Sequence, residues 1–230
     1  MNNGERARHA GTPTAPERFS SYTPAEELAN TLTHGLGLVL GIAGLVLLVV
    51  SASLRGGGRA VVSCSVYGAS LVLLYAASTL YHSARSPRAR RVFKIVDHSS
   101  IYLLVAGTYT PFLLVTLRGA WGWSLFGVVW GLAVAGIVFK TLFVHRFRLL
   151  STLLYVGMGW VILIAIRPLL RALPAGGLAW LLAGGLCYTG GVAFYLWKRL
   201  PYGHAIWHLF VLAGSLCHFF GVLLYVVPAR

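Results

Sequence analysis

Seven long apolar runs constrain the fold of this sequence more than any other feature. Runs of about 18 or more apolar residues are long enough to cross the hydrocarbon core of a bilayer as helices. Only 10% of the 230 residues are charged and 57% are hydrophobic, whereas about a quarter of the residues of a soluble domain are charged. The sequence therefore predicts an all-α, polytopic membrane protein, a seven-transmembrane-helix bundle with spans near 32–54, 60–81, 98–117, 122–143, 149–166, 176–197 and 204–227. The fifth run is the weakest of the seven, because it is short and ends against Arg167 and Pro168.

The first 22 residues differ from the rest of the chain. They are polar, rich in Pro, Thr, Ser and Arg, and lack the apolar centre of a cleavable signal peptide. We expect residues 1–22 to form a disordered cytoplasmic tail and residues 23–230 to form one membrane domain. The first apolar run then acts as an uncleaved signal anchor.

The formal net charge of +14 reflects basic residues in the short loops between the runs. This distribution sets membrane orientation, so we exclude nucleic acid as a partner. Thirteen Lys and Arg residues fall on the side of the N-terminus and six on the other side. The N-terminus is therefore predicted to be cytoplasmic and the C-terminus outside, in a multi-pass protein of the plasma membrane.

Ionisable residues gather at one end of the predicted bundle. His82 ends the second run, Asp97 begins the third, and His204 and His208 begin the seventh, all on the cytoplasmic side; His34 begins the first run on that side too. Four spans thus bring five ionisable groups to one depth.

The stretch HAIWH places two of these histidines on one helix face. His204 and His208 are four residues apart, about 6 Å along the face, so both can reach one metal ion. Two interfacial histidines would show the same pattern, but His82 supplies a third imidazole at that depth. Three imidazoles with an open fourth position are the arrangement of a catalytic Zn²⁺ site. The three cysteines lie far apart in apolar runs, without a C-x-x-C pair, so we expect no disulfide framework or thiolate site.

Asp97 and Ser78 each admit two interpretations. Asp97 is the only carboxylate after residue 27, and it either caps a helix or acts in a catalytic site. Ser78 lies one turn before His82 on the same helix face. Its hydroxyl either bonds back to its own helix or helps to hold a metal-bound water or a substrate carbonyl.

Further polar residues surround this end. Thr23 and Glu26 have the spacing of a capping box, and Glu26, Asn30 and His34 recur every fourth residue as a polar stripe that can approach the metal site. His98 adjoins Asp97 but points about 100° away, which makes it a candidate supporting group. His218 lies about 21 Å along the helix from His204, too far to share the site, and we expect it to meet a buried partner or the opposite interface.

The sequence resembles a known family. The segments EELANTLTHGLG, STLYHS, DHSSIYLLVAGTYTPF and HAIWHLFVLAGSLCHFFGV are similar to the bacterial haemolysin III branch of the progestin and adipoQ receptor family, over about residues 24 to 227. The resemblance implies seven helices with a cytoplasmic N-terminus. It also implies zinc held by His82, His204 and His208, with Asp97 and Ser78 around the zinc-bound water.

The family is similar to alkaline ceramidases, and its receptor members are associated with hydrolysis of ceramide-like amides. The resemblance therefore implies a zinc-dependent hydrolase of lipid amides or esters, with membrane lipids and a lipid-like small molecule as partners. The bacterial branch is named for haemolytic activity, so a lytic factor, or a sensor with a structural zinc, is the alternative. A third hypothesis is a proton relay of histidines without a metal.

Overall fold

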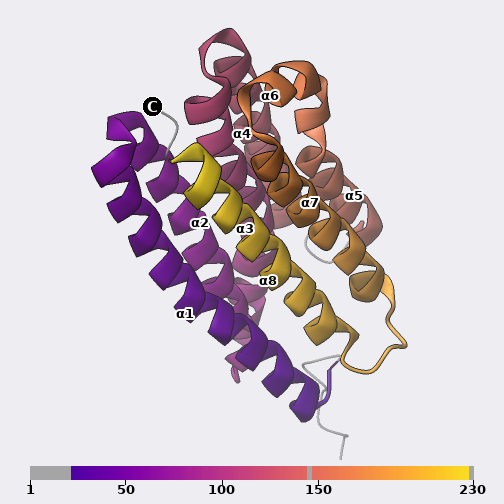
Figure 1. The fold of residues 1–230 in the computed structure, drawn as a ribbon. Coiled ribbons are helices and arrows are strands. Elements are labelled where there is room, and N and C mark those ends of the chain that lie inside the picture. The colour runs from indigo at the N-terminus through magenta and orange to yellow at the C-terminus, as the bar shows by residue number, and fades with distance from the viewer. Residues whose placement is uncertain (1–21, 144–146, 228–230) are drawn as a thin grey trace, which may run out of the picture.

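The computed structural model describes residues 22–143 and 147–227, and helices form nearly all of this part of the chain (Figure 1). Seven segments are long and apolar enough to cross a membrane, as the sequence predicted. They are α1 (Pro24–Arg55); α2 (Gly57–Ser83); α3 (Pro87–Pro111) with the π-helical segment Phe112–Leu117; α4 (Gly119–Leu142); α5 (Arg148–Gly159) with the 3-10 segment Val161–Ala165 and α6 (Ile166–Ala172); α7 (Ala175–Leu196); and α8 (Gly203–Gly221) with the π-helical segment Val222–Val226. The predicted tail lies outside the described residues, except for Tyr22.

The order of the helices in space places the last helix beside the first. α1 packs on α2, α2 on α3 and α3 on α4, while α7 packs on α8, and α8 returns beside α1 (Figure 1). The segment 87–117 is the most buried, with 72% of its apolar window inside the protein, against 28% for segment 24–55. α3 is therefore the central helix, and α1 shows side chains such as Leu32 and Val39 to the surroundings.

A glycine allows α1 and α2 to approach closely. A Cβ atom at Gly37 would lie 2.4 Å from Cδ1 of Tyr75, so the tyrosine ring packs directly on the α1 backbone. The Tyr75 hydroxyl then donates a hydrogen bond of 2.8 Å to Oγ of Ser215 on α8. Small residues serve such close contacts between membrane helices.

The fifth span is longer than predicted and is interrupted. The sequence placed its end at residue 166, before Pro168, but the span continues to Ala172. Pro168 is the third residue of α6, where the first-turn N–H would have no intrahelical acceptor, so proline is tolerated there. The interruption lies at Trp160 instead, between α5 and the 3-10 segment.

Tyr109 of α3 satisfies the backbone at this interruption. Its hydroxyl donates to the carbonyl of Gly159 at 2.7 Å and accepts the N–H of Ile162 at 2.9 Å. In a bilayer no water replaces such bonds, so an irregular segment persists only where protein groups pair its backbone.

We expect Tyr109→Phe to destabilise the protein by about 1–3 kcal/mol, because it leaves a buried N–H and a carbonyl without this partner. Thermal unfolding of the purified protein in detergent measures the loss. Tyr225→Phe, which removes a hydroxyl from a half-buried ring at the end of the last span, is the control. Equal melting temperatures for the two variants would contradict the bracing role of Tyr109.

Candidate metal centre

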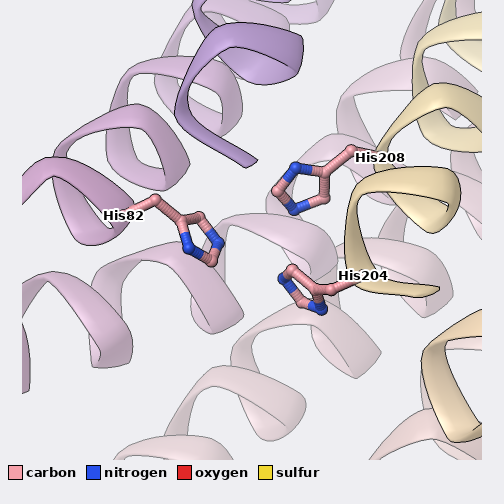
Figure 2. A group of neighbouring side chains, drawn as sticks. All are labelled: His82, His204 and His208. Carbon is pink, nitrogen blue, oxygen red and sulfur yellow. The ribbon is translucent and has the colours of Figure 1, made fainter. Parts of the chain in front are cut away.

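Three imidazoles converge between α2 and α8. His82 lies at the end of α2, and His204 and His208 lie in the first two turns of α8 (Figure 2). One nitrogen from each ring lies within 4.8 Å of the others. Whether His82 meets the two α8 histidines depends on how close α2 and α8 lie in space. The spacing of residues in the sequence does not give this distance.

The three rings share a chemical feature as well as a place. Nε2 of His82, Nε2 of His208 and Nδ1 of His204 are buried and have no hydrogen-bond partner within the described residues. Buried polar atoms are nearly always paired, and unpaired ones require an explanation such as a missing ion. One unpaired nitrogen from each of three rings fits a transition-metal ion, because neutral imidazole is a common metal ligand.

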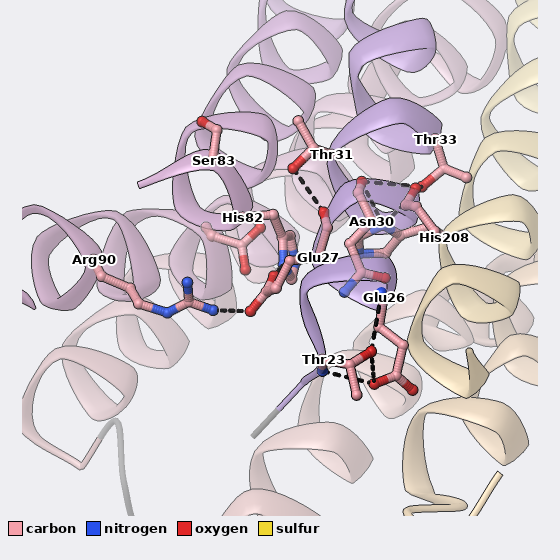
Figure 3. A network of polar contacts seen from close by, with 12 residues as sticks. Thr23, Glu26, Glu27, Asn30, Thr31, Thr33, His82, Ser83, Arg90 and His208 are labelled. Carbon is pink, nitrogen blue, oxygen red and sulfur yellow. Dashed lines mark hydrogen bonds and ion pairs between the residues drawn. The ribbon is translucent and has the colours of Figure 1, made fainter. Parts of the chain in front are cut away.

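The opposite edges of two rings are held by α1 (Figure 3). Nδ1 of His82 lies 2.7 Å from Oε2 of Glu27. Nδ1 of His208 lies 3.3 Å from the carbonyl oxygen of Asn30 and 3.2 Å from Oγ1 of Thr33. Such contacts fix the tautomer and the orientation of a histidine, so that its other nitrogen faces the metal.

Glu27 is the candidate site residue that the sequence analysis missed. Its second oxygen pairs with Arg90 of α3, so one carboxylate joins the α2 histidine to the basic segment of α3. The signal was present, because Glu27, Asn30 and His34 have the i, i+3, i+7 spacing of one helix face. The period-four stripe instead selected Glu26.

Glu26 has a different task. It completes the capping box with Thr23 at the start of α1, as predicted. Its Oε1 also accepts the backbone N–H of Tyr202 at 3.1 Å, just before α8 begins. Glu26 therefore ties the start of α1 to the start of α8, and its hydrogen bonds in the described part of the chain go to Thr23 and Tyr202.

His34 and Asn30 reach the centre from α1. The His34 ring stacks on that of His208, with centroids 3.4 Å apart and planes 15° apart. Both nitrogens of His34 and both side-chain polar atoms of Asn30 are buried and unpaired within the described residues. This part of the predicted polar stripe thus lies against the metal centre.

Asp97 does not cap a helix. The sequence placed the start of the third span at residue 98, but α3 begins at Pro87, capped by Ser86, so Asp97 lies in its third turn. The carboxylate is buried, with Oδ2 3.0 Å from Nδ1 of His98.

Ser78 is 1% exposed, and its hydroxyl has no hydrogen-bond partner among the described residues. Of the two interpretations left open by the sequence, the bond back to its own helix is not formed. The hydroxyl is therefore free to serve a bound molecule.

A cavity of about 290 Å³ adjoins the centre. His34 and Asp97 are among its lining residues, and most of the remaining lining is apolar and comes from α3, α5, α6, α7 and α8. A mostly apolar lining with a few polar groups suits an apolar molecule that carries a polar group.

Comparison with known proteins shows the family of the chain. Residues 22–219 match the family model described as haemolysin-III related. The chain belongs to this family. It is 55% identical over 203 residues to Hemolysin-3 of Bacillus cereus, covering 88% of this chain and 93% of that protein. It is 49% identical over 206 residues to the Hemolysin-3 homolog of Bacillus subtilis (strain 168), covering 90% and 97%.

A human protein extends the relationship beyond bacteria. The human monocyte to macrophage differentiation factor is 28% identical over 213 residues, covering 89% of this chain and 87% of its own. These matches confirm the resemblance to the haemolysin III branch of the progestin and adipoQ receptor family.

We expect Glu27→Gln to weaken zinc binding about 10- to 100-fold, because it removes the charge that orients His82. Competition with a chromogenic chelator measures the affinity. Glu26→Gln is the matched control, since the hydrogen bonds of the adjacent carboxylate go to Thr23 and Tyr202. Unchanged affinity in Glu27→Gln would show that the carboxylate has no part in the centre.

Proposed function

We propose that this membrane protein is a zinc-dependent hydrolase of lipid amides or esters, with its site near the cytoplasmic leaflet of the plasma membrane. One observation carries the proposal: three unpaired, buried imidazole nitrogens converge close to a buried carboxylate and an apolar cavity. This combination provides a metal site, a proton acceptor and a place for an acyl chain.

The donor set favours zinc. His82, His204 and His208 would hold the ion, and three neutral nitrogen ligands suit a borderline cation. No cysteine belongs to the group; Cys64, Cys187 and Cys217 are free thiols elsewhere in the helices. When bound, zinc on three imidazoles supplies Lewis acidity and activates water.

The residues of the chain then divide the remaining work. Asp97 accepts a proton from the attacking water and returns it to the amine or alkoxide that leaves as the C–N or C–O bond breaks; its contact with His98 holds the carboxylate in place. Ser78 donates its unpaired hydroxyl to the substrate carbonyl oxygen as negative charge develops there. The buried position of both groups strengthens these interactions, because little solvent competes with them.

We expect Asp97→Asn to retain zinc and to lose about 10²- to 10⁴-fold in turnover, because general-base catalysis contributes about that much. Elemental analysis and hydrolysis of a fluorogenic lipid amide by the same protein sample give the two readings. His82→Ala should lose both zinc and turnover.

Ser78→Ala should retain zinc and lower turnover, because it removes the hydroxyl that donates to the carbonyl oxygen. Ser83→Ala, which changes an exposed serine at the end of α2, is its control. Full turnover in Asp97→Asn would overturn the mechanism. A zinc-loaded wild-type protein that hydrolyses no lipid amide or ester would instead favour a sensor with a structural metal.

The names of the Bacillus relatives favour a second candidate, lysis of membranes. Leakage of dye from liposomes that contain the purified protein tests this function. Leakage that persists in Asp97→Asn would indicate lysis without hydrolysis.

The proposed orientation has its own test. In a cysteine-free background, we expect a cysteine at Gly58, the second residue of α2, to react with a membrane-impermeant maleimide on intact cells. A cysteine at Ser86, between α2 and α3, should react only after lysis. The opposite pattern would place the metal centre at the outer leaflet.

A further inference from the structure

The cavity has a second polar group far from the metal centre. His218 of α8 lines the same cavity as Asp97 and His34. It lies ten residues after His208, or about 15 Å along the helix. Apolar side chains such as Leu104, Leu181 and Val211 line the cavity as well. A long molecule in this cavity therefore meets polar groups at two separated points.

The imidazole of His218 is buried and unsatisfied. The residue is 5% exposed, and Nδ1 has no hydrogen-bond partner within the described residues. Two neighbouring hydroxyls that line the cavity are paired: Tyr188 with Oγ of Ser215 at 2.9 Å, and Thr189 with the carbonyl of Gly185 at 2.8 Å. The Tyr155 hydroxyl lines the cavity too and, like Nδ1 of His218, has no partner among the described residues. His218 is thus a polar contact that the protein leaves open.

The packing around His218 accommodates an imidazole. A Cβ atom at Gly184 of α7 would lie 2.5 Å from its Nε2, so the glycine makes room for the ring. The ring centroid of Tyr188, also on α7, lies 5.3 Å from that of His218. An apolar side chain could fill this space without the penalty of an unpaired buried nitrogen, so a purely space-filling role does not account for histidine here.

We propose that His218 binds a hydroxyl group carried part-way along the chain of a lipid whose carbonyl end lies near Asp97. The inference rests on the proposed function, because it assigns the same cavity to a lipid chain. A hydroxyl suits the site because it can donate to or accept from a neutral imidazole in either tautomer. A charged group is disfavoured at this depth, since it would lack water. His218 would thereby select hydroxylated chains over plain ones.

Binding of free acids to the zinc-loaded protein tests this selection without hydrolysis. The probes are stearic acid and three hydroxystearic acids. The single hydroxyl of these three lies next to the carboxyl, at mid-chain or at the methyl end. Each competes with a fluorescent fatty acid for the purified protein. We expect the mid-chain isomer to bind about fivefold more tightly than stearic acid, the effect of one net hydrogen bond. The other two isomers should show no such gain.

Two variants of His218 sharpen the test. His218→Asn keeps an N–H donor near the position of Nδ1 and should keep the preference. His218→Leu should lose it while binding stearic acid as the wild type does. Leu216→Ala, two residues away on a more exposed face of α8, is the control and should leave the preference intact.

The outcomes separate this inference from the proposed function. Stearic acid binding without any preference in the wild type, or a preference that survives His218→Leu, overturns the role of His218 alone. A preference without hydrolysis of any lipid supports the role of His218 and removes the enzymatic proposal. No binding of any acid overturns both, because the cavity would then hold no lipid chain.

Discussion

Pairing of buried polar groups, in a molecule surrounded by lipid, is the constraint on which this structure depends. The Tyr109 hydroxyl pairs the backbone of the interrupted fifth span, and Tyr75 of α2 pairs with Ser215 of α8. Because these internal partners are supplied so consistently, the side chains left without one stand out. Many of them lie at the end of α2 and the start of α8, beside the first turns of α1. Another is His218, which lines the cavity. At the unpaired groups of this cluster and at His218, a bound ion or molecule can supply the missing partner.

α1 is the element that turns three histidines into a centre. It packs on both α2 and α8 (Figure 1). Glu27 and the Asn30 carbonyl hold the outer edges of His82 and His208, and His34 stacks on His208. Its first turn is fixed in addition by the bond from Tyr202 to Glu26 and by the pair of Glu27 with Arg90. Any displacement of α1 would therefore misalign ligands that it does not itself carry.

The sequence predicted the parts of this arrangement that depend on one helix at a time. Hydropathy located all seven spans, and the i, i+4 spacing placed His204 and His208 on one face. The predicted start of the third span was wrong by about three turns, because the basic residues 88–94 lower the hydropathy of the first turns of α3. Ser86 followed by Pro87 is nevertheless a typical helix start in the sequence. The pairing of α8 with α1, and hence the role of Glu27, depends on contacts between distant segments, which no local pattern encodes. The break at Trp160 likewise depends on Tyr109, some fifty residues earlier.

The difference between a structural and a catalytic metal lies in how many ligands the protein supplies. Within the described residues, the group of mutually close metal-binding atoms contains three histidines and does not include Asp97. The Asp97 carboxylate lines the cavity instead. A structural zinc is closed by four protein ligands, whereas a catalytic one keeps a position for water or substrate. A buried carboxylate that lines the cavity, and does not belong to the group of three histidines, fits the proposed role of Asp97 as a proton acceptor. The same geometry gives the unpaired Ser78 hydroxyl a reason to lie buried one helical turn from His82.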